Sequence, residues 1–236
     1  MSMQSAIDLG LFDVIYKAGT DAKLSASDIA AEIGTKDPQA LAMMDRILRL
    51  LTSHSVLSCS VVTGQRLYNL TAVSKHFVTS EDGASLSPFM AFVQGSVVMS
   101  SWSQVKDAVV EGEIPFNRVH GKQLFECADS NPSFNGVFNS AMVSFTTLIM
   151  RRILDSYKGF EHLTQLVDVG GGLGVALSLI TSRYPHIKGI NYDLPHVIKH
   201  APQYPGGDMF SNIPSGDAIF MKNILHDWID EQCINY

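Results

Sequence analysis

Residues 166–174 read LVDVGGGLG, and this stretch decides the fold class of the chain. Three apolar residues and Asp168 predict a buried parallel strand over 166–169, and residues 175–183 predict the helix that follows. The glycines between them permit a tight turn whose bare backbone N–H groups can lie very close to a ligand. The stretch therefore predicts a strand, a glycine turn and a helix that together form a ligand site.

The spacing of the glycines separates two classes of cofactor. A dinucleotide fingerprint requires G-x-G-x-x-G, but Val175 stands where its third glycine would be. The order found here, G-x-G-x-G, suits the S-adenosylmethionine (SAM) methyltransferases better. An NAD-type oxidoreductase is the alternative enzyme, and a glycine turn that only closes an ordinary βα unit is the structural alternative.

Composition limits the classes of partner. The 236 residues carry a formal net charge of −6, which gives no electrostatic support for binding nucleic acid. No apolar run reaches the ~18 residues that span a membrane, and residues 1–10 lack the features of a signal peptide. Cys59, Cys127 and Cys233 are widely spaced, which predicts neither a disulfide framework nor a zinc site. We therefore expect a cytoplasmic protein that holds no metal.

The first part of the chain predicts a mainly α-helical winged-helix domain. Its expected elements are helices over 5–16, 24–34 and 38–51 and a hairpin of strands 56–62 and 66–70. Basic and acidic side chains nearly balance over residues 21–80, six against five. Such a module often binds DNA, but this balance favours a packing or dimerisation role over DNA binding.

Residues 88–155 predict longer helices. The segment 132–154 places Phe134, Phe138, Met142 and Phe145 at three- and four-residue steps, after an expected helix over 88–110. That stripe is most simply a core face, and it could equally line an apolar substrate pocket. The two uses are compatible.

From Leu166 onward strands alternate with helices, which predicts a parallel sheet and an α/β fold class. Further strands are expected over 187–192 and 218–221. Ligands of such sheets bind at the carboxyl ends of the strands.

Three candidate residues follow these strands. Asp193 lies 23 residues after Gly170, where a carboxylate can accept both hydroxyl protons of a ribose, although it could also cap the helix that begins at Pro195. Asp208 and Met209 could hold the exocyclic amine and the face of an adenine.

His226 is the best catalytic candidate among the eight histidines, because it directly follows a strand end on the expected ligand edge. An imidazole ordinarily titrates near pH ~6.5, which suits proton removal at neutral pH. A purely structural role for His226 is the alternative.

Together these segments resemble the plant class I small-molecule O-methyltransferases, the caffeic acid and flavonoid O-methyltransferase family. The resemblance spans essentially the whole chain and rests on segments 102–116, 134–142, 166–174, 187–198, 207–210 and 217–228. It implies a winged-helix dimerisation domain over 1–110 and a Rossmann-like SAM-dependent methyltransferase domain over 111–236.

The resemblance also implies roles for individual residues. The residues that it assigns to SAM are Gly170, Asp193, Asp208, Met209 and Lys222. His226 would be the general base, and Phe92, Phe138 and Met142 would line a phenolic pocket together with segment 124–142. The implied reaction transfers a methyl group to a phenolic hydroxyl without a metal, in a homodimer. The acceptor could be a phenylpropanoid, flavonoid or alkaloid phenol, and a nitrogen acceptor stays open.

The chain departs from the family pattern at several places. Family members continue well past Tyr236, the third strand before Asp208 is shortened, Leu173 replaces a threonine, and residues 144–147 lack the family's histidine. The expected protein is therefore a C-terminally truncated methyltransferase domain, weak or inactive alone, with strand 218–221 as an exposed edge. The alternative is a catalytically dead fragment that dimerises with full-length homologues.

Overall fold

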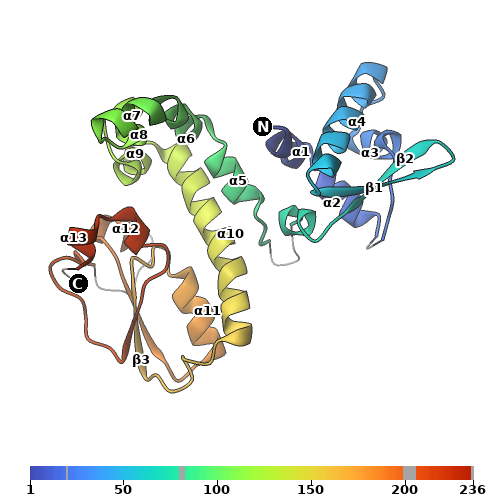
Figure 1. Ribbon diagram of the computed structural model, residues 1–236. Helices are drawn as coiled ribbons and strands as arrows, with labels where there is room; N and C mark the ends of the chain where they lie inside the picture. Colours follow the sequence, from blue (N-terminus) through green and yellow to red (C-terminus); the bar gives the residue numbers. More distant parts are fainter. Residues whose placement is uncertain (20, 80–82, 199–205, 235–236) are drawn as a thin grey trace. The chain divides into compact units, whose positions relative to one another are not determined.

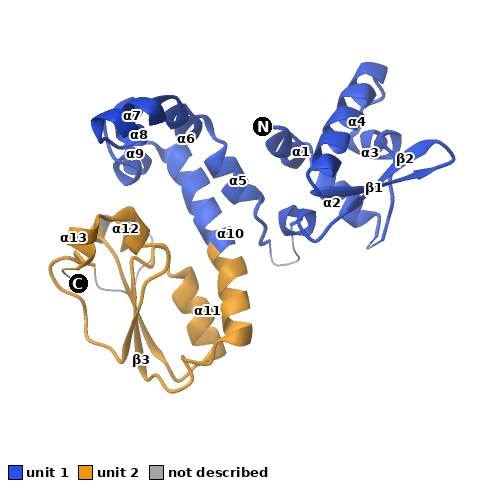
Figure 2. Ribbon diagram, viewed as in Figure 1, with its two compact units in different colours: residues 1–145 blue, residues 146–236 orange. Residues whose placement is uncertain are grey.

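The structure is a computed structural model that describes residues 1–19, 21–79, 83–198 and 206–234 (Figure 1). The chain divides into two units, Met1–Phe145 and Thr146–Tyr236 (Figure 2). The predicted domain boundary after residue 110 lies in helix α7 (Val105–Glu111), inside the first unit, and stays a prediction.

The first unit begins with the helices and hairpin that the sequence predicts (Figure 1). They are α1 (Ser2–Asp8), α2 (Leu11–Lys17), α3 (Ala26–Ile33), α4 (Pro38–Ser53), β1 (Leu57–Val62) and β2 (Gln65–Leu70). The expected helix over 5–16 is two helices, because Gly10 takes a left-handed φ of 67° between them. Helix α3 begins at a capping box between Ser25 and Asp28 and ends at Gly34, as the serine and glycine signals predict.

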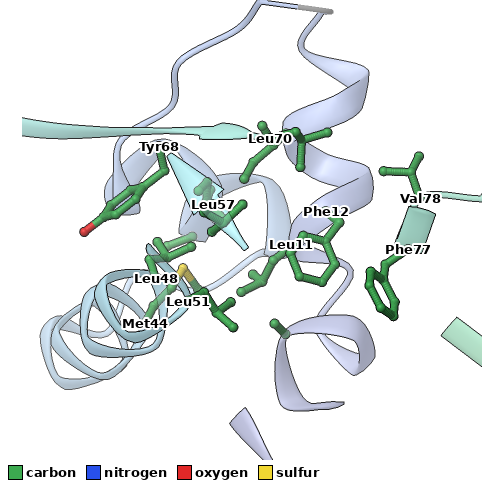
Figure 3. Packing of buried hydrophobic residues seen from close by; sticks show 14 residues of the cluster. Leu11, Phe12, Met44, Leu48, Leu51, Leu57, Tyr68, Leu70, Phe77 and Val78 are labelled. Atoms are coloured by element: carbon green, nitrogen blue, oxygen red, sulfur yellow. The ribbon is translucent and has the colours of Figure 1, made fainter. Parts of the chain in front are cut away.

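A buried apolar cluster joins these elements (Figure 3). Leu11 and Phe12 of α2, Leu48 of α4 and Leu57 of β1 are at most 1% exposed. Tyr68 of β2 is fully buried as well, and its hydroxyl points out of the cluster (Figure 3). Burial of each such side chain contributes about 1.5–3 kcal/mol, so this cluster fixes the hairpin against the helices.

The Tyr68 hydroxyl donates to a carboxylate on α4. Asp45 Oδ1 accepts from Tyr68 at 2.7 Å, and both Asp45 oxygens accept from the Arg66 guanidinium at 2.8 and 3.2 Å. The hydrogen bonds from Arg66 hold the pKa of Asp45 below its usual range, despite partial burial. Burial, followed by the hydrogen bond to Asp45 and then the Asp45 charge, raises the pKa of Tyr68 to about 12. Asp45 thus ties Arg66 and Tyr68 of β2 to α4.

Replacing Asp45 with alanine is expected to lower the free energy of unfolding by about 1–3 kcal/mol, because the buried Tyr68 hydroxyl loses its acceptor. Urea unfolding followed by circular dichroism measures the change. Arg49→Ala is the matched control, since it removes only an exposed ion pair to Asp45 on the same helix, worth about 0.3–0.5 kcal/mol. Equal effects of the two substitutions would show that the tyrosine contact adds nothing.

The remainder of the first unit is helical. It contains η1 (Ser74–Phe77), α5 (Ser87–Val93), α6 (Ser96–Ser101), η2 (Trp102–Gln104), α7, α8 (Pro115–His120) and α9 (Leu124–Ser130). The expected helix over 88–110 is wrong as a single element, because Gly95 has an extended backbone between α5 and α6. The long helix expected over 132–154 is present as α10 (Pro132–Ser156) and continues into the second unit.

The second unit contains a parallel sheet in the order β4-β3-β5. Its strands are β3 (Gln165–Val169), β4 (Lys188–Tyr192) and β5 (Ala218–Phe220), and its helices after β3 are α11 (Val175–Arg183), α12 (Pro195–Ile198), η3 (Leu225–Asp227) and α13 (Asp230–Cys233). Leu166 and Val167 of β3 and Leu177 and Ile180 of α11 are at most 1% exposed. The predicted βα alternation and parallel sheet are therefore confirmed.

The edges of this sheet bear on two predictions, the exposed edge strand and the shortened third strand. In the described part of the chain, β5 pairs only with β3, so its outer edge is open as expected, and Ile219 is 53% exposed. The shortened third strand includes residues 204–205, which lie outside the described residues. At its described end, Gly206 forms an isolated parallel bridge with Asp193. None of the helices described is long and apolar enough to cross a membrane.

Candidate functional site

The glycine turn connects β3 to α11. Gly170 and Gly172 have φ values of 68° and 57°, in the left-handed region that side chains disfavour. The N–H of Gly170 donates to the carbonyl of Tyr192 at 2.8 Å, which fixes the start of the turn against β4. The Ile224 side chain lies over Gly170, because a Cβ added there would lie 2.2 Å from Ile224 Cδ1. A side chain at position 170 would therefore strain the left-handed backbone and require Ile224 to move.

Asp193 contacts the turn directly. Its Oδ2 accepts from Gly172 N at 2.8 Å, and its Oδ1 accepts from Leu194 N at 2.7 Å. A carboxylate has about four acceptor positions, so it can still accept from hydroxyl groups. The hydrogen bond from Leu194 N, just before α12, is similar to a helix cap, the alternative to a ribose-binding role for Asp193. The structure places Asp193 against the glycine turn, as a shared ligand site requires.

Asp208 and Met209 lie in the turn that precedes β5. The exposed Asp208 carboxylate accepts from Phe210 N at 2.9 Å and from Ser211 Oγ at 3.2 Å. Met209 packs against the cluster of Val167, Val169 and Tyr192. Asp208 therefore closes its own turn, while Met209 packs beside the carboxyl ends of β3 and β4.

Lys222 follows β5 and is half-buried. Its Nζ donates to Thr146 Oγ1 at 3.1 Å and to Asn223 Oδ1 at 2.8 Å. Burial lowers the pKa of Lys222, and the Asp168 charge opposes that shift. The ammonium group is thus a positive charge near the carboxylates at this edge of the sheet.

His226 lies in η3, beyond Lys222. Its Nε2 is 3.3 Å from Asp227 Oδ1, and its side chain is 63% exposed. Burial raises the pKa of Asp227, while His226 acts in the opposite direction. The Phe210 and Trp228 rings meet edge to face with centroids 4.8 Å apart. This ring contact brings the Asp208 turn beside the His226 segment.

The three residues predicted to line the acceptor pocket belong to the first unit. The Phe92 ring of α5 lies 5.4 Å from the Phe138 ring of α10, edge to face. Phe138 also contacts Phe125 of α9 at 6.0 Å. Met142 is one helical turn beyond Phe138 and is partly buried. These contacts form an aromatic face on α5, α9 and α10.

Family models match both parts of the chain. The O-methyltransferase domain matches residues 102–236, and the O-methyltransferase dimerisation domain matches residues 1–80. The chain belongs to the O-methyltransferase family. Membership removes the NAD-type oxidoreductase, and the match over 1–80 favours a dimerisation domain over a DNA-binding winged helix. Neither limit coincides with the predicted boundary after residue 110.

Relatives of this O-methyltransferase-family chain are plant enzymes. Anthranilate N-methyltransferase of Ruta graveolens is 56% identical over 241 residues, which cover 99% of this chain and 66% of that protein. Caffeic acid 3-O-methyltransferase of Prunus dulcis is 50% identical over 246 residues, 100% of this chain and 67% of that protein. The chain thus spans about two thirds of the length of the curated relatives that it matches.

Solved structures of similar proteins show the same fold. Human N-acetylserotonin methyltransferase in complex with SAM has a TM-score of 0.76 at 23% identity, over 99% of this chain and 69% of that one. A methyltransferase of calicheamicin biosynthesis, in its SAH-bound form, has a TM-score of 0.79 at 20% identity with the same coverage. The predicted Rossmann-like methyltransferase fold of this family member is confirmed.

Sequence reasoning missed two polar residues at the centre of the methyltransferase unit. Asp168 of β3 and Asn191 of β4 are 1% and 0% exposed. Burial first, then the Asp193 charge, raises the pKa of Asp168 to about 7, against the effect of Lys222. The available signal was a polar residue between two large hydrophobic neighbours in each strand, Asp168 between valines and Asn191 between Ile190 and Tyr192. In the described ranges, no group of three or more His, Cys, Asp or Glu side chains could hold a metal.

Proposed function

We propose that the chain transfers the methyl group of SAM to a phenolic hydroxyl of a small aromatic plant metabolite, as a cytoplasmic homodimer. The observation that carries the proposal is the hydrogen bond between Asp193 and Gly172 N, in a chain of this family. It joins the predicted ribose-binding carboxylate to the glycine turn. Asp208, Met209, Lys222 and His226 follow the neighbouring strand ends of the same unit.

The residues present fit SAM. Asp193 and Asp208 each use two acceptor positions and retain others for the ribose hydroxyls and the adenine amine. Met209 offers a polarizable thioether to the adenine face. Gly170 permits the left-handed backbone at the start of the turn, and Lys222 would lie beside the bound cofactor. When bound, SAM supplies an electrophilic sulfonium methyl group.

His226 would act as the general base. A phenol has an ordinary pKa near ~10, so a positioned imidazole that removes its proton raises the nucleophilicity of the oxygen at pH 7. Asp227 Oδ1, 3.3 Å from His226 Nε2, would orient the imidazole. The rest of the acceleration would come from alignment of the acceptor oxygen with the methyl group.

Phe92, Phe138 and Met142 would line the pocket of the acceptor. Their rings and thioether form a face suited to a flat aromatic molecule. An aromatic amine is a second candidate acceptor, favoured by the 56% identity to anthranilate N-methyltransferase. The dimer would form through the predicted domain 1–110, and residues 111–236 would form the methyltransferase domain.

The test is a calorimetric titration of the purified chain with SAM and S-adenosylhomocysteine. One-site binding by the wild-type chain is expected. Asp193→Ala should weaken it by at least about a hundredfold, because two hydrogen bonds to a charged acceptor are lost, each worth about 1.5–3 kcal/mol. Asp155→Ala, an exposed aspartate of α10 in the same unit, is the control and should bind SAM like the wild type.

Failure of a folded chain to bind SAM would overturn the proposal. Co-elution of that chain with a full-length relative in size-exclusion chromatography would then support the alternative, a catalytically dead dimerisation partner. Turnover of phenolic and anilinic acceptors in parallel would separate oxygen from nitrogen methylation.

A further inference from the structure

Two buried oxygen atoms meet beneath the glycine turn without a hydrogen-bond partner. They are Asp168 Oδ2 and Asn191 Oδ1, on residues that are directly paired in neighbouring parallel strands. A Cβ added to Gly171 would lie 2.0 Å from the Asn191 oxygen and 2.7 Å from the Asp168 oxygen. The two oxygens therefore both lie directly against Gly171. Buried polar atoms without partners are rare, and this pair requires an explanation.

The orientation of the Asn191 amide is fixed by its other end. Its Nδ2 donates to the carbonyl oxygen of Gly172 at 2.9 Å. Exchange of the amide ends would bring two acceptors together at that distance and lose the bond. Asn191 consequently faces Asp168 with an acceptor. An ionised Asp168 would face the Asn191 oxygen with a second acceptor, which is unfavourable because both buried groups would then lack a donor.

Charged groups face Asp168 from the neighbouring elements. Asp193 at the end of β4 carries a like charge, and Lys222 at the end of β5 carries the opposite one. The backbone N–H of Leu177 in α11 also lies against the Asp168 carboxyl group. Burial and Asp193 outweigh Lys222 and Leu177, so the pKa of Asp168 rises to about 7.

We propose that Asp168 is a carboxylic acid whose Oδ2–H donates to Asn191 Oδ1, and that this bond positions the glycine turn. With the proton on Asp168, a continuous chain of hydrogen bonds forms, which we call the relay. Asp168 donates to Asn191, Asn191 Nδ2 donates to Gly172 O, and Gly172 N donates to Asp193 Oδ2. Asp168 and Asn191 are thus positioning residues for the Asp193 carboxylate. Their effect on SAM rests on the proposed function, whereas the proton on Asp168 does not.

The relay makes the second unit sensitive to pH. The pKa of Asp168 in the folded chain, about 7, exceeds its ordinary value of 3.8. A raised carboxyl pKa contributes stability that is complete below about pH 4 and is lost as pH rises through about 7. SAM affinity should fall over the upper part of that window, about tenfold for one broken hydrogen bond.

The experiment compares the wild-type chain with Asp168→Asn, whose amide N–H can donate to Asn191 at every pH. Both chains are unfolded in urea at pH values from 5 to 9, and unfolding is followed by tryptophan fluorescence. Both carry Trp102→Phe, so that Trp228 in the second unit is the only tryptophan and the signal comes from that unit. The wild-type urea midpoint should fall as pH rises to 7, and the variant should lose that fall. The same slope in both chains would overturn the proposal.

Asp217→Asn is the matched control. Asp217 accepts from Thr164 and Gln165, and these bonds lower its pKa, so its removal should leave the slope between about pH 5 and 7 intact. If Asp168→Asn fails to fold, carboxyl 13C NMR of the wild-type chain decides the question. One aspartate should titrate near pH 7 and persist in Asp227→Asn; its absence would overturn the proposal.

SAM titrations at pH 6 and 9 separate the two proposals. Wild-type affinity should fall about tenfold over this range and the affinity of Asp168→Asn should stay constant. If neither chain binds SAM, the proposed function fails, but the pH dependence of the urea midpoints still tests whether Asp168 is protonated. If both bind with the same pH dependence, the relay does not position Asp193.

Discussion

Replacing His226 with glutamine is expected to slow methyl transfer by about 10²–10⁴-fold, with SAM affinity unchanged. Glutamine fills a similar volume but cannot take a proton, so the phenol must lose its proton to water. The predicted SAM residues Asp193 and Asp208 accept from backbone N–H groups and a serine hydroxyl rather than from His226, so they stay in place. Single-turnover rates at saturating SAM measure the step directly, free of product release.

Two comparisons make this prediction specific. His186→Gln is the control, because His186 precedes β4 at the opposite end of the strands and should retain full activity. An acceptor with a more acidic phenol should recover much of the rate lost in His226→Gln, since its oxygen is already ionised. A uniform loss for all acceptors, or no loss at all, would remove His226 from the role of base.

The sequence predicted those parts of the fold that short-range chemistry determines. The boundaries of α3 followed from Ser25 and Gly34, because a capping side chain and a left-handed glycine act on adjacent backbone groups. The strand before the glycine turn followed from its apolar run. Gly10 and Gly95 each divide a segment that apolar periodicity alone predicts as one helix, because periodicity takes no account of the backbone conformation of a glycine.

Contacts between distant residues could not be predicted in the same way. The Phe210–Trp228 ring contact and the Asp193–Gly172 hydrogen bond depend on how strands pair, which no local pattern specifies. The pairing of Asp168 with Asn191 likewise requires the register of β3 and β4. Sequence reasoning therefore named the residues at the strand ends but missed the buried pair that supports them.

Gly171→Ala is expected to destabilise the second unit by about 1–3 kcal/mol and to abolish measurable SAM binding. Its φ lies outside the left-handed region, so alanine causes no backbone strain. The added methyl group would instead lie 2.0 Å from Asn191 Oδ1 and 2.7 Å from Asp168 Oδ2. Both side chains are buried, and a shift of Asn191 would strain or break its hydrogen bond to the Gly172 carbonyl.

Gly136→Ala gives the opposite expectation for the same chemical change. Gly136 lies within α10, and a Cβ there meets nothing within 4 Å, so alanine should stabilise the helix by about 0.5–1 kcal/mol. Urea unfolding and SAM titration of the two variants measure both effects. If Gly171→Ala binds SAM normally, Asp168 and Asn191 do not exclude a methyl group at position 171, and the prediction is wrong. If it folds stably but binds no SAM, the close packing beneath the turn is required for cofactor binding rather than for folding.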